Sequence, residues 1–164
     1  MERFEQIYEE HHDAVRAFVR RRAPESVVDD VVSETFLVCW RRLDRVPAQP
    51  LPWLYAVARK TLANQRRRLD RDERLGGAAS TPVAAEPEPV GDTALAAAFA
   101  ALSERDREVL RLVAWEGLSL GQAAVALGCS AVACRVRYHR AKARLARRLE
   151  AEANFRPDLK GATR

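Results

Sequence analysis

Residues 102–145 read LSERDREVLRLVAWEGLSLGQAAVALGCSAVACRVRYHRAKARL, and this stretch decides the fold of the C-terminal half of the chain. Gly117 and Gly128 stand where the C-terminal caps of two helices belong. Ser119 and Gln122 form an S-x-x-Q capping box, which begins the helix between the two glycines. A short helix, a GCS turn and a longer basic helix follow one another, and this helix-turn-helix order lays its second helix in the major groove of DNA. The stretch therefore predicts a module that binds duplex DNA.

The second helix of this motif, expected over residues 131–150, has an apolar side and a basic side. Residues at steps of three and four predict the buried side, namely Cys134, Tyr138, Ala141, Leu145 and Leu149. A second face is basic and consists of Arg135, His139 and Lys142, flanked by Arg137, Arg140 and Arg144. Arginine suits this face because its guanidinium pairs bidentately with guanine and also neutralises phosphate. The alternative is an ordinary solvated face of charged residues.

The first seventy residues show the same helical periodicity. Apolar residues recur at steps of three and four over residues 4–19, and again over residues 28–43. These stripes predict two amphipathic helices. The three prolines within residues 45–52 predict a loop, after which residues 53–69 are again periodic. The pattern predicts one helical module over residues 1–69.

One row on the helix expected over residues 53–69 holds residue types that bind nucleic acid. At about 100° per residue, the row opposite the apolar side consists of Trp53, Lys60, Asn64 and Arg67. An aromatic ring stacks on unstacked bases, and cations contact phosphates. The alternatives are structural, because a tryptophan at a helix start is more often a core anchor, and basic residues also complement a helix C-terminus.

The character of the sequence changes between the two modules. Residues 70–93 hold Gly, Ala, Pro and acidic residues without a periodic apolar face, which is typical of a flexible linker. Beyond them, four helices are expected over residues 94–102, 106–115, 119–127 and 131–150. The predicted fold class is therefore all-α, with two small helical domains over residues 1–69 and 94–150, the linker over residues 70–93, and a frayed C-terminal tail over residues 151–164.

The composition agrees with a globular protein that binds an anionic partner. The chain has 164 residues, 48% hydrophobic and 31% charged, with a formal net charge of +5. Its pI near 9.6 favours a partner such as nucleic acid. No stretch resembles a signal sequence, and no apolar run approaches the roughly 18 residues of a membrane span. We therefore expect a cytoplasmic protein without membrane insertion.

The sequence holds no recognisable catalytic, metal or cofactor motif. It contains no Ser-His-Asp grouping, Gly-rich phosphate loop or HExxH sequence. Cys39, Cys129 and Cys134 lack CxxC pairing, so roles in packing are expected for them. No metal, cofactor or catalytic residue is predicted, which disfavours an enzyme acting on nucleic acid.

Three runs of sequence, taken in order, resemble the extracytoplasmic-function sigma factors, the two-domain members of the sigma-70 family. They are DDVVSETFLVCWRRLD at residues 29–44, PWLYAVARKTLANQRRR at residues 52–68, and the stretch at residues 102–145 quoted above. The third run alone is specific only for a sigma-type helix-turn-helix, whereas the three in this order are strongly specific. The resemblance implies a factor that binds core RNA polymerase, recognises the −35 and −10 elements and opens promoter DNA.

The resemblance also implies roles for residues of each run. Those that would pack on the clamp helices of the largest polymerase subunit are Asp30, Glu34, Thr35 and Phe36. Those that would open the −10 region and capture an extruded base are Trp53, Lys60 and Asn64, with Arg67 completing their row. Those that would meet the −35 element are Arg135, Val136, His139 and Arg140, beside Lys142.

Two positions depart from the family pattern. Lys60 stands where many relatives have asparagine, so the −10 preference does not follow from the resemblance. Gly121 stands where a better helix former is usual, and we expect it to loosen the helix that supports the recognition helix.

The implied partners are core RNA polymerase, through its clamp helices and flap, and promoter DNA, with an anti-sigma protein as a candidate inhibitor. Asp30 and Glu34 lie one helical turn apart and are expected to stay near solvent, with Phe36 partly available to a partner. The rival function is a helix-turn-helix regulator that binds an operator without polymerase, its first module serving for dimerisation or sensing. Binding to core polymerase distinguishes the two.

Overall fold

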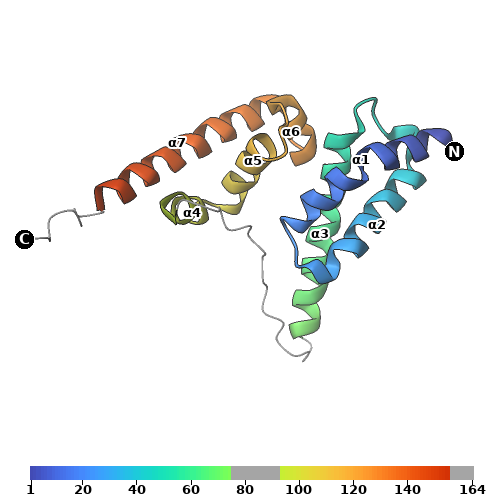
Figure 1. The fold of residues 1–164 in the computed structure, drawn as a ribbon, viewed down its shortest axis with the longest axis horizontal. Helices are drawn as coiled ribbons and strands as arrows, with labels where there is room; N and C mark the ends of the chain where they lie inside the picture. The colour runs from blue at the N-terminus through green and yellow to red at the C-terminus, as the bar shows by residue number, and fades with distance from the viewer. Residues whose placement is uncertain (75–92, 156–164) are drawn as a thin grey trace, which may run out of the picture. The chain divides into compact units, whose positions relative to one another are not determined.

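The computed structural model describes residues 1–74 and 93–155. It divides the chain into two compact units, Met1–Pro87 and Glu88–Arg164. Every regular element in the described ranges is a helix (Figure 1), which confirms the predicted all-α fold class. Most of the expected linker and part of the expected tail lie outside the described residues.

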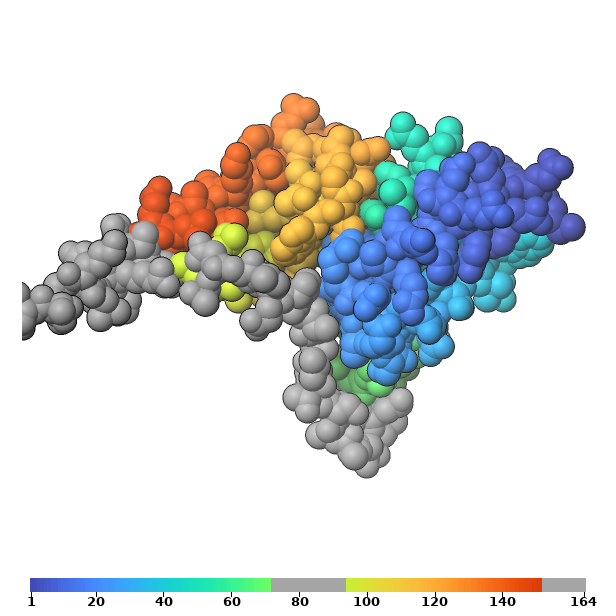
Figure 2. Space-filling model, in the orientation of Figure 1, coloured from blue at the N-terminus to red at the C-terminus, as the bar shows by residue number. Residues whose placement is uncertain are grey.

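The first unit is built from three long helices and one short turn of 3-10 helix. They are α1 (Glu2–Arg20), α2 (Glu25–Arg41), η1 (Leu43–Arg45) and α3 (Pro50–Arg74). Prolines bound two of these helices, because Pro24 precedes α2 in an extended conformation and Pro50 is the first residue of α3. A proline is tolerated in the first turn of a helix, where no intrahelical partner exists for its missing N–H. The helices α1 and α2 present a continuous surface in the space-filling view (Figure 2).

All three helices of the first unit contribute to one core. Its fully buried side chains include Val15, Phe18, Val19, Val28, Val31, Cys39, Leu54 and Ala58. The ring of Phe18 stacks on that of Tyr55, with centroids 4.3 Å apart. The buried guanidinium of Arg22 lies 3.7 Å from the Phe18 ring centroid and donates to the Phe18 carbonyl oxygen at 3.0 Å. These contacts join α1 and the turn after it to α3.

The second unit places three short helices against one long helix. It consists of α4 (Thr93–Ala100), α5 (Glu104–Ala114), α6 (Leu120–Leu127) and α7 (Ala131–Phe155). The long helix α7 contacts each of the other three. Buried residues from all four helices form the core, including Ala98, Val109, Leu112, Ala123, Ala126, Cys134 and Ala141.

The predicted caps of the second unit are confirmed. The Ser119 hydroxyl accepts from the Gln122 backbone N–H at 3.2 Å, and the Ser119 backbone N–H donates to Gln122 Oε1 at 2.9 Å. Gly117 and Gly128 adopt φ of +65° and +66°, a left-handed conformation that glycine accepts without strain. Ser103 adds a cap not predicted from the sequence, and α5 consequently begins at Glu104 rather than at the expected residue 106.

Two predicted helix ends were too early. The helix expected to end at residue 69 continues to Arg74, and the helix expected to end at residue 150 continues to Phe155. The sequence of the five added residues explains each case, because neither DRDER nor AEANF contains glycine or proline. The first five residues of the expected linker and of the expected tail are therefore helical.

Candidate nucleic-acid and partner interfaces

The recognition helix α7 is fixed at its start by the turn that precedes it. Ser130 caps the helix, since its hydroxyl accepts from the Ala133 backbone N–H at 3.1 Å. Along the inner side, Cys134 and Ala141 are fully buried, and Tyr138, Leu145 and Leu149 are half-buried. The buried side predicted from the sequence is therefore confirmed.

The outer face of α7 carries the residues predicted to contact the −35 element. All five are exposed, namely Arg135, Val136, His139, Arg140 and Lys142. Val132, one turn before Val136, is 73% exposed and extends the same surface. Within the described residues, none of the three cations on this face forms an ion pair, so their donors remain free for an anionic partner.

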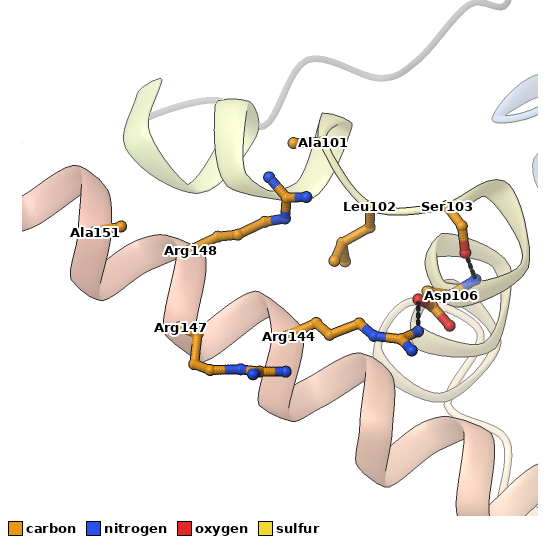
Figure 3. Close-up of a pocket in the computed structure, with 8 residues that line it drawn as sticks. All are labelled: Ala101, Leu102, Ser103, Asp106, Arg144, Arg147, Arg148 and Ala151. Carbon is orange, nitrogen blue, oxygen red and sulfur yellow. Dashed lines mark hydrogen bonds and ion pairs between the residues drawn. The ribbon is translucent and has the colours of Figure 1, made fainter.

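The C-terminal half of α7 is different, because its arginines surround a pocket against the start of α5. The pocket measures about 520 Å³ and is lined by Ala101, Leu102, Ser103, Asp106, Arg144, Arg147, Arg148 and Ala151. Arg144 Nη1 lies 2.6 Å from Asp106 Oδ2, and Arg148 extends toward Ala101 (Figure 3). Arg144, expected to flank the basic face, is instead held in an ion pair inside the unit.

In the first unit, three of the four residues of the predicted −10 row line one open groove between α2 and α3. The groove measures about 890 Å³, and the three residues are Trp53, Lys60 and Asn64. Lys60 and Asn64 are exposed, whereas Trp53 is half-buried and thus combines anchoring with an accessible edge. Arg67 does not line the groove, but its Nη2 donates to Asn64 Oδ1 at 2.6 Å. The predicted row therefore forms one connected surface.

The carboxylates predicted to contact polymerase line the other side of the same groove. Asp30 and Glu34 are exposed on α2 and face the groove that Lys60 and Asn64 line from α3. The sequence reasoning treated the two sets as separate surfaces. Both sets follow helical spacing, but only the packing of α2 on α3 shows that they share one groove.

The expectation that Phe36 is partly available to a partner is wrong. Phe36 is only 3% exposed, because the Tyr8 ring of α1 covers it in an edge-to-face contact with centroids 4.8 Å apart. Thr35 is fully buried, and its hydroxyl donates to the Val31 carbonyl oxygen at 2.7 Å. In this structure, Thr35 and Phe36 support the outer surface of α2 from within.

Sequence reasoning missed a cluster of exposed apolar side chains above Phe36. Tyr8, Leu37 and Trp40 are 41%, 40% and 47% exposed, and we call these three residues the aromatic patch. Phe4 connects it, since its ring lies 5.1 Å from that of Trp40 and 6.1 Å from that of Tyr8. The signal was present in the four-residue spacing of Phe4 with Tyr8, which marks one face of a helix.

The described residues hold no group of three or more side chains that could bind a metal ion. Burial raises the pKa of the Cys39 and Cys134 thiols, which agrees with the packing role expected for them, whereas Cys129 is only half-buried. No helix in the described part of the chain is long and apolar enough to cross a membrane.

Comparison with known proteins identifies both units. Residues 7–72 match Sigma-70 region 2, and residues 92–145 match Sigma-70, region 4. The RNA polymerase sigma factor NccH of Alcaligenes xylosoxydans xylosoxydans is 33% identical over 156 residues, which cover 87% of this chain and 84% of NccH. The chain belongs to the sigma-70 family of RNA polymerase sigma factors. The ECF sigma factor SigL of Mycobacterium tuberculosis, 27% identical over 143 residues and 81% of each chain, confirms the predicted resemblance to that group.

Solved structures of other sigma factors have the same fold. The sigma factor RpoE of Bartonella quintana, in complex with the anti-sigma factor NepR, has a TM-score of 0.69 and 25% identity, covering 92% of this chain and 98% of its own. CnrH, in complex with the cytosolic domain of CnrY, has a TM-score of 0.59 and 30% identity, covering 90% and 88%. This sigma factor therefore directs promoter-specific initiation by RNA polymerase. The rival regulator is disfavoured, since region 2 accounts for the first unit.

Proposed function

We propose that the two units of this sigma factor divide promoter recognition, with α7 reading the −35 duplex and α3 contacting the −10 region. The observation that carries the proposal is the two-sided nature of α7. Its inner side is held by the fully buried Cys134 and Ala141, while Arg135, His139 and Arg140 are exposed on the outside. A helix fixed in this way presents arginines to base edges and phosphates in a defined register.

At the −10 region, Trp53 would stack on an extruded base, and Asn64 would contact that base or its neighbour. The hydrogen bond from Arg67 restricts the Asn64 amide to one orientation, which favours a specific contact. Lys60 has three donors and no acceptor, so it cannot pair bidentately with adenine as asparagine does. We therefore expect Lys60 to contact phosphate or a base acceptor, which gives a −10 preference different from that of relatives with asparagine.

Core polymerase would bind the exposed side of α2. Asp30 and Glu34 offer two carboxylates to a cationic surface on the clamp helices, and neither is consumed by an ion pair within the described residues. Thr35 and Phe36 would act indirectly, by holding α2 against α1. In this role the sigma factor performs no chemistry itself and works in the cytoplasm, where polymerase meets promoter DNA.

An anti-sigma protein is the second partner we propose. RpoE and CnrH are both solved in complex with another protein, the anti-sigma factor NepR and the cytosolic domain of CnrY. On this chain the aromatic patch of Tyr8, Leu37 and Trp40 provides apolar area that such an inhibitor would cover.

Run-off transcription tests the proposed function. Purified sigma factor and core polymerase are incubated with a library of genomic fragments, and the transcripts are sequenced to locate their start sites. We expect transcripts that share two upstream elements and depend on the added factor. Duplex binding without any affinity for core polymerase would instead support the free-standing regulator.

A further inference from the structure

The turn of the helix-turn-helix holds two cysteines whose side chains contact each other. Cys129 directly follows Gly128, and Cys134 lies in the first turn of α7. Their thiols form a hydrogen bond, although five positions separate them in the sequence. Cys134 is fully buried, while Cys129 is half-buried and reaches the surface. This pair is not a CxxC motif and was not recognisable in the sequence.

The backbone around the pair is fixed on both sides. The Cys129 backbone N–H donates to the Ala124 carbonyl oxygen at 3.1 Å, as part of the end of α6. The Cys134 backbone N–H donates to the Ser130 carbonyl oxygen at 2.9 Å, in the first turn of α7. The two sulfur atoms are therefore held close together by hydrogen bonds within the turn rather than by chance rotamers.

We propose that Cys129 and Cys134 are a site of reversible oxidation, at which a peroxide converts the hydrogen-bonded thiol pair to a disulfide at the start of the recognition helix. The surface position of Cys129 admits the oxidant, and the neighbouring buried thiol is placed to react with the product. Disulfides in reducing compartments are typically transient and redox-sensing. This site would add regulation to the sigma activity and does not depend on it.

The reaction balances with hydrogen peroxide as the oxidant. The Cys129 thiolate attacks one peroxide oxygen, the O–O bond breaks, hydroxide leaves, and Cys129 becomes a sulfenic acid. The Cys134 sulfur then attacks the Cys129 sulfur, the S–O bond breaks, and the hydroxyl leaves as water with the Cys134 proton. Two thiols lose two electrons in total, and one peroxide is reduced to two waters. Burial raises the pKa of Cys134, which suits it to the second step rather than the first.

The disulfide would alter the DNA-reading surface. The two sulfur atoms must move from hydrogen-bonding separation to a bond of about 2.05 Å, with a restricted dihedral angle. Because the Cys134 side chain is fully enclosed, this movement must displace either the turn or the first turn of α7. Arg135 and Val136 follow Cys134 directly and would move with it.

Peptide mass spectrometry tests the oxidation. The full chain is treated with hydrogen peroxide, alkylated and digested with trypsin, which leaves both cysteines in the single peptide 112–135. We expect this peptide to lose two hydrogen atoms, to take up no alkyl group, and to regain two alkylation sites after dithiothreitol. Full alkylation after peroxide, or sulfinic acid on Cys129 without a bridge, would overturn the proposal. This measurement needs neither polymerase nor a promoter, so it is independent of the proposed function.

Hydrogen exchange tests the structural consequence. We expect faster amide exchange over residues 130–137 in the oxidised chain, and unchanged exchange in Cys129→Ser after the same treatment. Cys39→Ser is the matched control, because Cys39 is buried in the other unit and its loss should leave both the bridge and the exchange response intact. In holoenzyme, binding to a promoter found by run-off transcription should weaken by about tenfold, as for the loss of one base contact. Equal exchange in oxidised and reduced protein would refute the coupling to α7.

Discussion

Arg144 of α7 donates a hydrogen bond from Nη1 to Asp106 Oδ2 of α5 over 2.6 Å, and this ion pair connects the recognition helix to the helix that supports it (Figure 3). The Asp106 side chain is almost fully buried, while that of Arg144 is half-exposed. Asp106 also uses its backbone N–H, which donates to the Ser103 hydroxyl at 3.2 Å. One residue thus takes part in both the cap of α5 and the attachment of α7.

We predict that Arg144→Ala destabilises the second unit by about 1–3 kcal/mol, because it leaves the buried carboxylate of Asp106 without its charged partner. Thermal unfolding followed by circular dichroism measures the loss. Arg147→Ala is the matched control, since Arg147 is an exposed arginine on the same helix that forms no ion pair within the described residues. Equal melting temperatures for the two variants would show that the ion pair contributes nothing.

We predict that Gly121→Ala stabilises the protein by about 0.5–1 kcal/mol, because alanine loses less conformational freedom than glycine in a helix. Gly121 is exposed in the first turn of α6, and an added Cβ would approach only the Ser119 hydroxyl, at 3.9 Å. The expected loosening of α6 is thus a property of the free energy of unfolding, measurable by urea denaturation.

Gly128→Ala is the opposite case and provides the control. An added Cβ there meets nothing within 4 Å, but φ is +66°. The left-handed conformation costs a non-glycine residue about 1–2 kcal/mol, so this variant should be less stable than the native protein. Destabilisation by Gly121→Ala would show that the glycine is required for a reason other than space or backbone conformation.

Local features of this fold were predictable from the sequence because they depend on neighbouring residues. The capping box of Ser119 and Gln122 and the left-handed glycines at 117 and 128 need only a few adjacent positions, and the structure confirms each. The exposed face of α7 follows from helical spacing once Cys134 and Ala141 are assigned to the core.

Features that depend on contacts between helices were not predictable. The burial of Phe36 requires Tyr8, which lies 28 positions earlier in the sequence and reaches it only when α1 packs on α2. Arg144 has the spacing of a DNA-facing residue, yet Asp106 of α5 binds it. The proximity of Cys129 to Cys134 likewise depends on the geometry of the turn. A helical pattern assigns a face to a side chain but does not identify its partner.

We predict that Arg135→Ala weakens −35-dependent transcription without lowering the melting temperature, because Arg135 is exposed and has no ion pair within the described residues. A bidentate base contact would cost about 1–3 kcal/mol and relax the preference at one base pair. A phosphate contact would instead weaken all sequences alike and reduce the salt dependence of binding. Run-off transcription over a salt series separates the two.

Arg147→Ala controls for the loss of one positive charge on α7. It lies on the same helix in the pocket against α5, not on the proposed −35 face. Promoter activity of Arg135→Ala equal to that of Arg147→Ala at every salt concentration would remove Arg135 from the DNA interface.

The last prediction concerns the acidic side of the groove between α2 and α3. Reversing both charges, with Asp30→Lys and Glu34→Lys, should change the stability of the isolated fold by no more than some 0.3–1 kcal/mol per site, because both side chains are exposed and surface charges contribute little. A cationic polymerase surface would respond far more strongly, since two attractions become two repulsions. We therefore expect a near-native melting temperature, together with loss of binding to core polymerase and of run-off transcription.

The control must carry the same change in net charge on another exposed surface of the same unit. Glu5→Lys with Glu9→Lys meets this condition, because the two residues lie one turn apart on α1 and are exposed. Added positive charge also strengthens nonspecific attraction to DNA, so binding to core polymerase is measured without DNA. If only the α2 variant loses binding, the effect belongs to the groove and not to net charge. Wild-type binding by a folded α2 variant would exclude Asp30 and Glu34 from the polymerase interface, whereas equal loss in both variants would indicate a general electrostatic attraction.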